Sequence, residues 1–570
     1  MSNIDTQNDA RELRKKKWKS KLRQIIAASV ANLSSVAYGM AMSWPTPSLP
    51  LLKTGKPLLD GRIISVEEET WLGSLVFFGA LVSSPISSYV SQKYGRKIAG
   101  YSIVIPFIVS WLFIVLSESL YLFYISRFSL GLCCGGVLVF CPMYVGEIAE
   151  DSIRGALGTF RSALVDIAFI IMYAVGPLIS IKNMAIICVF IPIVFAFGYY
   201  WMPESPLYLM KNGRSQEAME SLLWLRGGDA QAAEVEMMKL TALVKKNKSV
   251  NTSIKSLLSS RGTRRALVIC IVLGASIQLS GIYPVLNYAV SIFEQTGGSV
   301  DPNTATLIIA IVQMIGSLVA LFLLDIAGRR LLIIVTQTIM CICLAGLGIY
   351  FFLQQQNYDL ISVGFLPILF VGLFVFLLSV GLGTVGYVVM SEMFKAEARG
   401  IATTVTTITV WLTAFMSTKL YVNIIDLLGL HGCYWLFAFF CIGCAVFTIF
   451  KVPETKNRSL ESILHELDSD VKSDEEGVEI TAGRSKITER HDPKLQEYCV
   501  CPQNMPQFDS EGIPNQAPET NKPMVINGPT SRNREGSDQV SVSVEAKQLG
   551  HLYLSIDQET FDPSTGEPYD

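Results

Sequence analysis

The stretch Gly95-Arg96-Lys97 returns late in the chain as Gly328-Arg329-Arg330, and two further motifs return with it in the same order. Glu147 followed by Arg154-Gly155 is matched by Glu392 followed by Arg399-Gly400. Pro203-Glu204-Ser205 is matched by Pro453-Glu454-Thr455. Because three motifs recur in one order, we infer that the chain contains two copies of a single ancestral unit.

Each copy also contains six long apolar runs. The chain is 51% hydrophobic and only 16% charged, whereas ordinary soluble domains have about 25% charged residues. A membrane-spanning helix needs roughly 20 apolar residues, and two parallel six-span repeats are typical of secondary transporters. We therefore predict an all-α membrane protein, a carrier with twelve transmembrane helices in two parallel six-helix repeats. The runs begin near Ile25, Trp71, Ile98, Leu120, Gly155, Asn183, Ala266, Thr304, Leu331, Leu360, Gly400 and Gly432.

Composition also excludes other classes of function. The net charge of −2 predicts no nucleic-acid partner, and the sequence lacks the GxxxxGK[ST] loop of proteins that use ATP. The twelve cysteines lie mostly in apolar runs, where they are typical small hydrophobic residues. We expect no disulfide framework, no metal site, no cofactor and no enzymatic activity.

Basic residues indicate the orientation in the membrane. They precede the first run, as in Lys15-Lys16-Lys17, and follow the second and eighth runs. Lysine and arginine concentrate on the cytoplasmic side, so we expect both termini inside the cell and a location in the plasma membrane. The predicted parts are a basic cytoplasmic N-terminus (1–24), a first six-helix bundle (25–202), a cytoplasmic helical linker (203–264), a second bundle (265–452) and a mostly disordered cytoplasmic tail (453–570).

The linker has two helical runs, Gln216–Arg226 and Ala230–Lys246. Ala218, Leu222 and Leu225 share one face of the first run, which favours docking under the bundle. The tail is polar and rich in Ser, Pro and Gly, so it cannot bury a core; the sequence identifies no partner for it.

The repeated motifs predict a gating network at the cytoplasmic ends of the helices. Glycines permit tight turns, and the cations that follow can reach carboxylates or helix C-termini. Glu147 and Glu392 end one run each, and Arg154 and Arg399 begin the next, so they are natural partners. The expected network comprises Arg96, Glu147, Arg154 and Glu204 in the first copy, and Asp325, Arg329, Glu392, Arg399 and Glu454 in the second.

The sequence resembles the sugar porter family of the major facilitator superfamily, and its pattern is most similar to the insect facilitated trehalose transporters. The resemblance extends from about residue 31 to residue 460 and implies alternating access around a central site. The motifs that carry it are Ser43-Trp44 with Pro47-Ser48-Leu49-Pro50, Arg127 with Gly131, Pro142-Met143-Tyr144-Val145-Gly146-Glu147, Arg154-Gly155-Ala156-Leu157-Gly158, Pro203-Glu204-Ser205-Pro206, Leu279-Ser280-Gly281, Ser391-Glu392-Met393-Phe394 and Pro453-Glu454-Thr455-Lys456.

The chain departs from the family at the positions that bind sugar. The family's span-7 pattern Gln-Gln-x-Ser-Gly-x-Asn is here Gln278-Leu279-Ser280-Gly281-Ile282-Tyr283 after Ile277, so one glutamine and the asparagine are lost. Ser162 replaces a glutamine in span 5, and span 10 has lost its prolines and tryptophan. Each lost hydrogen bond to a hydroxyl removes about 0.5–1.5 kcal/mol. The substrate-binding candidates are Gln278, Gln313, Tyr283, Tyr288, Ser162, Asp166, Thr384, Tyr387 and Trp411; the tyrosines could equally pack between helices.

Asp166 lies well inside the fifth run, where a carboxylate costs about 2.5–3.5 kcal/mol to insert. It falls one turn after Ser162, on the same helix face. It could be a proton or cation site, a contact for a cationic substrate, a residue of a water-filled cavity, or a residue paired with a neighbouring helix. By resemblance, proton-coupled relatives carry an acid in span 1, whereas residues 24–59 here contain none.

The sequence therefore favours facilitated diffusion of a small polar solute, with a sugar such as trehalose or a hexose as the default. Three alternatives stay open: a proton- or cation-coupled symporter that uses Asp166, a carrier for a non-sugar solute, and a sugar sensor that does not transport. The lipid bilayer is the other expected partner.

Overall fold

The computed structural model describes residues 2–53, 63–117, 119–248, 261–297, 300–394 and 396–456, and a few positions up to residue 467. The chain divides into two units, Met1–Arg484 and Ser485–Asp570, and all of the described residues lie in the first. Throughout these residues the regular structure is helical. Eleven helical segments in the described ranges are long and apolar enough to cross a membrane, six before the linker and five after it. The expected all-α membrane fold is therefore confirmed.

The first half is built from long helices, several of which end at a glycine or a polar residue. Ser65 starts α3 with a reciprocal cap, because its hydroxyl accepts from the Glu68 amide and the Glu68 carboxylate accepts from the Ser65 amide. The elements are α1 (Ser2–Ser43), α2 (Pro45–Lys53), α3 (Val66–Tyr94), α4 (Arg96–Leu116), α5 (Leu120–Ile148), α6 (Asp151–Val175), η1 (Gly176–Leu178) and α7 (Ile181–Tyr200).

The second half repeats the pattern with more interruptions. The elements are α12 (Arg261–Leu279), α13 (Ile282–Asn287), α14 (Ala289–Thr296), α15 (Pro302–Ala327), α16 (Arg329–Gln355), η2 (Ile361–Val363), α17 (Leu366–Val380), α18 (Leu382–Glu392) and α19 (Ala396–Lys451). The last segment is unusually long, and Gly429 inside it has non-helical angles of φ 73° and ψ 166°.

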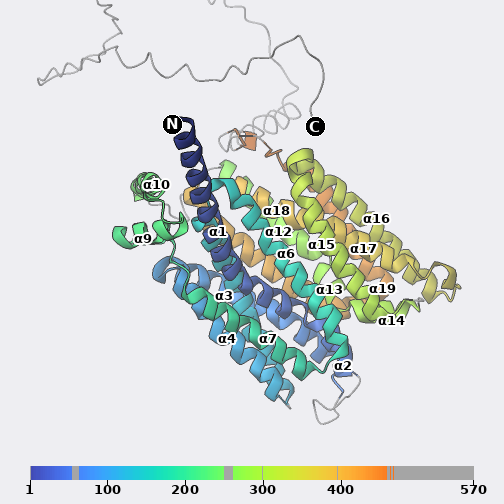
Figure 1. The fold of residues 1–570 in the computed structure, drawn as a ribbon. Coiled ribbons are helices and arrows are strands. Elements are labelled where there is room, and N and C mark those ends of the chain that lie inside the picture. The colour runs from blue at the N-terminus through green and yellow to red at the C-terminus, as the bar shows by residue number, and fades with distance from the viewer. Residues whose placement is uncertain are drawn as a thin grey trace, which may run out of the picture. The chain divides into compact units, whose positions relative to one another are not determined.

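Between the halves lie α8 (Pro206–Lys211), α9 (Ser215–Leu225) and α10 (Ala230–Lys248), close to the expected helical runs. Ala218, Leu222 and Leu225 are fully buried, as a docked face requires. Figure 1 shows α9 and α10 near the start of α1.

The two halves pack on each other through two pairs of helices. α3 lies against α19, and α6 lies against α15. In Figure 1 the blue to teal helices of the first half group together beside the yellow to orange helices of the second. A site between the halves is therefore lined by α6 and α15 on one side and by α3 and α19 on the other.

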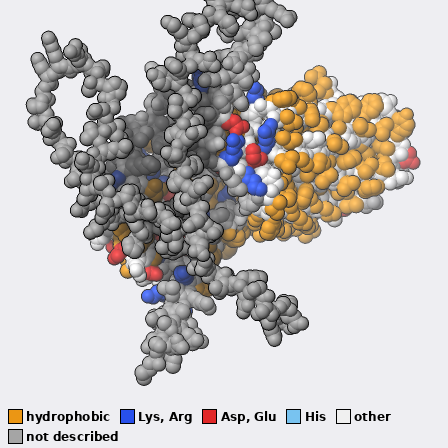
Figure 2. Space-filling view, turned by 90° about the horizontal axis from the view of Figure 1, so that it is seen from above, with side chains coloured by type: hydrophobic (Ala, Val, Ile, Leu, Met, Phe, Trp, Pro, Cys, Tyr) orange, Lys and Arg blue, Asp and Glu red, His pale blue; other side chains and the backbone are white. Residues whose placement is uncertain are grey.

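The repeated turns mark one end of the helices, which we call the basic end; the other is the opposite end. Gly95 (φ 102°) joins α3 to α4, and Gly328 (φ 82°) joins α15 to α16, both in the backbone region that favours glycine. Figure 2 looks onto the basic end, where basic and acidic side chains gather beside a broad hydrophobic flank. Such a flank is what lipid requires.

Candidate functional site

The basic end holds the same network twice, once in each half. In the first half Arg96 forms two hydrogen bonds with Glu147, at 2.7 and 2.6 Å, and the Ser205 hydroxyl donates to the same carboxylate at 2.5 Å. In the second half Arg329 lies 3.2 Å from Glu392, and Thr455 donates to that carboxylate at 2.6 Å. The repeated motifs thus build repeated contacts.

Glu204 and Glu454 act at the start of a helix in each half. Glu204 accepts from the amides of Arg96 and Lys97 at 3.0 and 2.9 Å, which are the first amides of α4. Glu454 accepts from the amides of Arg329 and Arg330 at 3.0 and 3.1 Å. A carboxylate is favourable there because the first amides of a helix lack partners within it.

These carboxylates explain the glycines of the turns. A Cβ at Gly95 would lie 2.5 Å from a Glu204 oxygen, and one at Gly328 would lie 2.9 Å from a Glu454 oxygen. Because four backbone donors surround Glu454, its pKa falls below the usual 4.5, although burial alone would raise it. The carboxylate therefore stays charged at neutral pH.

Arg154 does not take the partner that the sequence predicts for it, and the side chains of two further members of the expected network, Asp325 and Arg399, lie outside the described residues. Glu147 pairs with Arg96, whereas the exposed Arg154 donates to the Ala149 carbonyl at 3.2 Å. The reason is that Arg96 reaches Glu147 from the neighbouring turn.

Asp166 and Gln313 meet across the interface between the halves. Asp166, on α6, is 4% exposed, and its Oδ1 accepts from the Gln313 amide, on α15, at 2.8 Å. Ser317, one turn farther along α15, and Arg161 on α6 lie near this carboxylate. Asp166 Oδ2 and Gln313 Oε1 are buried and form no hydrogen bond within the described part of the chain. Ser162, one turn before Asp166, is half-buried.

A helix break at Gly281 separates two groups of predicted binding residues. Gly281 has φ 85°, and a Cβ there would lie 2.3 Å from the Phe437 ring, so glycine is required on both counts. Because the chain leaves the helix between α12 and α13, Gln278 and Tyr288 do not lie on one continuous helix.

Gln278 and Tyr288 are nevertheless both buried. Gln278 is 2% exposed, and its Oε1 has no hydrogen-bond partner among the residues that the structure describes. Tyr288 stacks on Tyr421 with ring centroids 5.0 Å apart. The Tyr288 hydroxyl likewise forms no hydrogen bond in the described part of the chain, although its ring is held by aromatic packing.

Tyr283 lies beneath the opposite end. Its ring centroid is 4.5 Å from that of Phe77 on α3, and its hydroxyl is 3.5 Å from that of Tyr38 on α1. Tyr387 on α18 is 48% exposed. Trp411 on α19 stacks on the other side of this group, 6.2 Å from Phe77. The aromatic side chains in contact here are Tyr38, Phe77, Tyr283 and Trp411. They come from α1, α3, α13 and α19, so both halves contribute.

Thr384 does not present a free donor to this site. The chain breaks at Gly381 between α17 and α18, and the Thr384 hydroxyl donates to the Ser379 carbonyl at 2.7 Å. Ser and Thr commonly satisfy such broken ends. Its predicted role in binding is weakened by that bond.

Contacts between the halves also close the opposite end, and the sequence analysis did not find them. The ammonium of Lys419 on α19 donates to the Thr70 hydroxyl at 2.8 Å and lies 4.2 Å from the Trp71 ring centroid, both on α3. Thr46 on α2 donates to the Leu286 carbonyl on α13 at 2.8 Å. A lysine inside an apolar run was the available signal for Lys419, since such residues are rare in spans.

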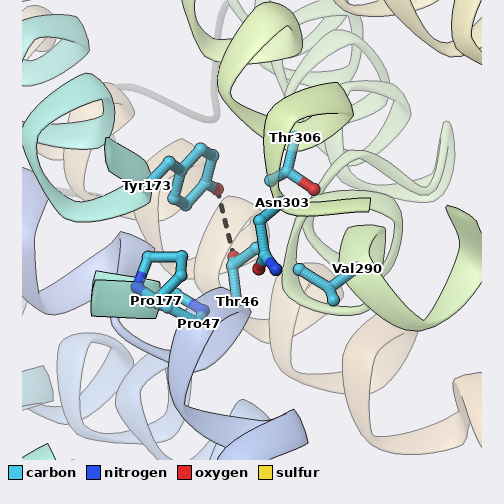
Figure 3. Close-up of a pocket in the computed structure, with 7 residues that line it drawn as sticks. All are labelled: Thr46, Pro47, Tyr173, Pro177, Val290, Asn303 and Thr306. Carbon is cyan, nitrogen blue, oxygen red and sulfur yellow. Dashed lines mark hydrogen bonds between the residues drawn. The ribbon is translucent and has the colours of Figure 1, made fainter. Parts of the chain in front are cut away.

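A narrow hollow remains at this seam, without room for a water molecule. Figure 3 shows that Tyr173 points toward Thr46, with 3.1 Å between their hydroxyls, while Val290, Asn303 and Thr306 face them from the second half. Binding pockets for small molecules have about 300–1,000 Å³. We therefore interpret the hollow as part of the closed seam.

Arg127 on α5 is fully buried without a carboxylate among its hydrogen-bond acceptors in the described structure. Its guanidinium donates to the carbonyls of Ala41 and Leu72 at 2.8 and 3.0 Å and lies 5.1 Å from the Trp44 ring centroid. Backbone oxygens and an aromatic face stabilise the cation.

With this geometry in place, the comparisons with known proteins decide the family. The profile described as "Sugar (and other) transporter" matches residues 26–467. The chain belongs to this family. A transporter of this family is not an enzyme.

Two curated relatives of this sugar-transporter chain carry the name facilitated trehalose transporter Tret1. The protein of Bombyx mori is 34% identical over 447 residues, which are 78% of this chain and 87% of the relative. The protein of Drosophila mojavensis is 30% identical over 77% of this chain, and the aligned region spans about half (51%) of the relative's length.

Solved structures of the xylose transporter XylE from E. coli share the fold. One, described as a proton:xylose symporter bound to 6-bromo-6-deoxy-D-glucose, has a TM-score of 0.64 at 20% identity and covers 78% of this chain and 99% of that one. An inward-open XylE structure has a TM-score of 0.63 at 20% identity, covering 76% and 98%.

Proposed function

We propose that this chain is a twelve-span carrier that moves a small polar solute, with a sugar such as trehalose or a hexose as the default, by facilitated diffusion. The observation that carries the proposal is the set of polar groups buried between the halves. Gln278, Gln313 and Trp411 each keep a buried polar atom without a hydrogen bond in the described residues. Hydroxyl groups of a solute would satisfy them, on walls that are otherwise aromatic.

The length of α19 supports the twelfth span. The apolar segment Ala402–Lys451 has 50 residues, which at 1.5 Å per residue is about 75 Å of helix, more than twice a bilayer core of about 30 Å. The non-helical Gly429 divides it into two lengths that each suit one crossing.

Contacts at the opposite end support alternating access. Lys419, Thr46 and Tyr283 join the halves there, whereas the paired networks at the basic end each lie within one half. At the basic end, a Cβ added at Gly146, Gly155 or Gly158 would meet nothing within 4 Å. By the positive-inside rule the basic end faces the cytoplasm. The carrier is therefore closed on the outside and opens toward the cytoplasm. It lies in the plasma membrane with both termini inside the cell.

Asp166 supports a second candidate, a proton- or cation-coupled carrier. A buried carboxylate with one oxygen unbonded in the described structure could take up a cation. The groups that face it are Gln313 and Ser317 from α15 and the cation Arg161 from α6. Arg127 favours the uncoupled mechanism. Its hydrogen bonds in the described structure go to backbone carbonyls and not to a carboxylate that could take up and release a proton.

Uptake into proteoliposomes tests both candidates. Radiolabelled trehalose and glucose are offered to the full chain at two external pH values, with Asp166→Asn beside the wild type. Saturable sugar uptake that is equal at both pH values supports the proposal. Uptake that depends on a proton gradient in the wild type, and no longer depends on it in Asp166→Asn, supports coupling. Folded protein that transports neither sugar points to a non-sugar solute or a sensor.

A further inference from the structure

The part of α1 that precedes the first apolar run has two different faces. With 3.6 residues per turn, Ser20, Gln24, Ala27 and Ala31 fall on one face, and all four are buried. Trp18, Leu22 and Ile25 fall on the other face and are 66%, 41% and 40% exposed. One face of this helix is thus attached to the protein, while the other is apolar and largely exposed.

The attached face is fixed by specific bonds. Glu150, between α5 and α6, accepts from the Ser20 hydroxyl and the Gln24 amide, both at 2.8 Å. Arg23 donates to the Trp224 carbonyl on α9 at 2.9 Å and lies over its ring. Burial alone would raise the pKa of Glu150, but these hydrogen bonds and the charge of Arg226 bring it below the usual value, so the anchor stays ionised. The helix is therefore held in place.

The apolar face is bordered by cations. Lys15, Lys16, Lys17 and Lys19 are all exposed. At 3.6 residues per turn, Lys15 and Lys19 lie on one side of the stripe of Trp18, Leu22 and Ile25, and Lys17 lies on the other. The stripe continues directly into the lipid-facing residues of the first span, where Ile26 is 43% exposed. This level is therefore the boundary between hydrocarbon and headgroups.

We propose that residues 15–25 of α1 form a binding site for anionic phospholipid headgroups, with Trp18 seated in the interface and the lysines on the phosphate and carboxylate groups. Tryptophan is suited to the interface because its ring is amphipathic. Clusters of lysine beside a span attract the anionic lipids of the cytoplasmic leaflet. The hydrogen bonds of Ser20, Gln24 and Arg23 hold Trp18 and the lysines at the depth of the lipid headgroups. An unattached basic tail would not be held there.

The site also touches the linker through the same helix. Arg226 on α9's C-terminal side, 3% exposed, pairs with Glu236 on α10 at 2.6 Å and lies 3.6 Å from Glu150. Lipid bound on one face of α1 thus lies opposite the bonds that dock the linker to the first half.

Native mass spectrometry of the full chain in detergent tests the proposal. The protein is titrated with phosphatidylserine or with phosphatidylcholine. The variant Lys15→Gln/Lys16→Gln/Lys19→Gln is compared with Lys211→Gln/Lys239→Gln/Lys245→Gln, which removes three exposed lysines of the linker. We expect the first variant to bind phosphatidylserine roughly tenfold more weakly or worse, and the second to stay within about twofold of the wild type.

A second pair of variants tests the aromatic anchor. Trp18→Ala should weaken phosphatidylserine binding, whereas Trp201→Ala, at another tryptophan that is more than half exposed, should not. Added inorganic phosphate should compete poorly if the ligand is the whole lipid.

Three results would overturn the lipid site. They are equal phosphatidylserine binding by the two triple variants, binding of phosphatidylcholine as strong as that of phosphatidylserine by the wild type, and displacement of phosphatidylserine by free phosphate at the same concentration as the lipid. Equal binding by the two tryptophan variants would overturn the anchor.

Discussion

Asp166 and Gln313 are joined by a 2.8 Å hydrogen bond that crosses from the first half of the molecule to the second. The bond lies at the contact of α6 with α15, where the halves must move relative to each other if access alternates. We propose that this bond both ties the halves together and forms part of the central site.

Replacing Gln313 by leucine should destabilise the protein, because it leaves the buried Asp166 carboxylate without its neutral donor. We expect a loss of about 1–3 kcal/mol, measured as a lower midpoint of thermal unfolding in detergent. The double variant Asp166→Asn/Gln313→Leu should recover much of the lost stability, because the asparagine at position 166 carries no charge that needs a donor. Equal midpoints for the single and the double variant would contradict the tie.

Gln278 and Thr384 should differ in their effect on uptake. Gln278 has an unbonded buried oxygen, so Gln278→Leu should raise the KM for the transported sugar roughly two- to tenfold. Thr384→Val should change KM by less than about twofold, because the hydroxyl already serves the Ser379 carbonyl. The assignment fails if the threonine variant raises KM as much as the glutamine variant.

Lys419 should hold the opposite end closed. Lys419→Met removes a hydrogen bond and a cation–aromatic contact between the halves, so a cysteine placed at Gln278 should react about threefold faster or more with an impermeant maleimide added outside. Lys53→Met is the matched control, since Lys53 pairs with Glu69 within the first half at 2.9 Å. Identical rates in the two variants would show that Lys419 is no latch.

The two copies of the basic-end network should differ in strength. Arg96 and Glu147 have side chains 4% and 12% exposed and meet at 2.6 Å, whereas Arg329 and Glu392 are 13% and 31% exposed and meet at 3.2 Å. Glu147→Gln leaves a buried guanidinium without its counter-charge and should cost about 3 kcal/mol, and Glu392→Gln should cost about 1 kcal/mol. Thermal unfolding of both variants measures which substitution costs more stability. A larger loss for Glu392→Gln than for Glu147→Gln would contradict the prediction.

Stability should fall in acid in part through Glu454. Its pKa is lower in the folded protein than the usual 4.5, so its contribution is complete above about pH 4.5 and is lost as the pH falls through the folded pKa. Glu454→Gln should therefore be less stable than the wild type at neutral pH and lose less stability on acidification. Parallel unfolding curves for the two proteins from pH 7 down to about pH 3, which covers the range below 4.5 where the loss is expected, would rule out this contribution.

Much of the basic end could be predicted from the repeated motifs. The sequence identified Glu204 and Glu454 as members of a network, but it did not show that they accept from the first amides of α4 and α16. That role depends on bringing Glu454 to backbone more than a hundred residues away in the chain. Periodicity carries no such information, because it describes one helix at a time.

The central site was predicted less completely. Asp166 was recognised as unusual, and its neighbour Ser162 as a cavity residue, but the partner Gln313 was assigned only to the substrate. The break at Gly281 was missed because a glycine in an apolar run is compatible with a continuous helix, and the Phe437 ring that occupies its side comes from a distant part of α19.

The sequence alone determined the all-helical membrane fold, the repeated units and the family, because apolar length, basic turns and motif order are properties of consecutive residues. Only the tertiary structure decided which polar groups face one another between the halves and which end is closed. Those pairings are set by how α3 meets α19 and α6 meets α15, and packing between distant helices depends on the shapes of both surfaces at once.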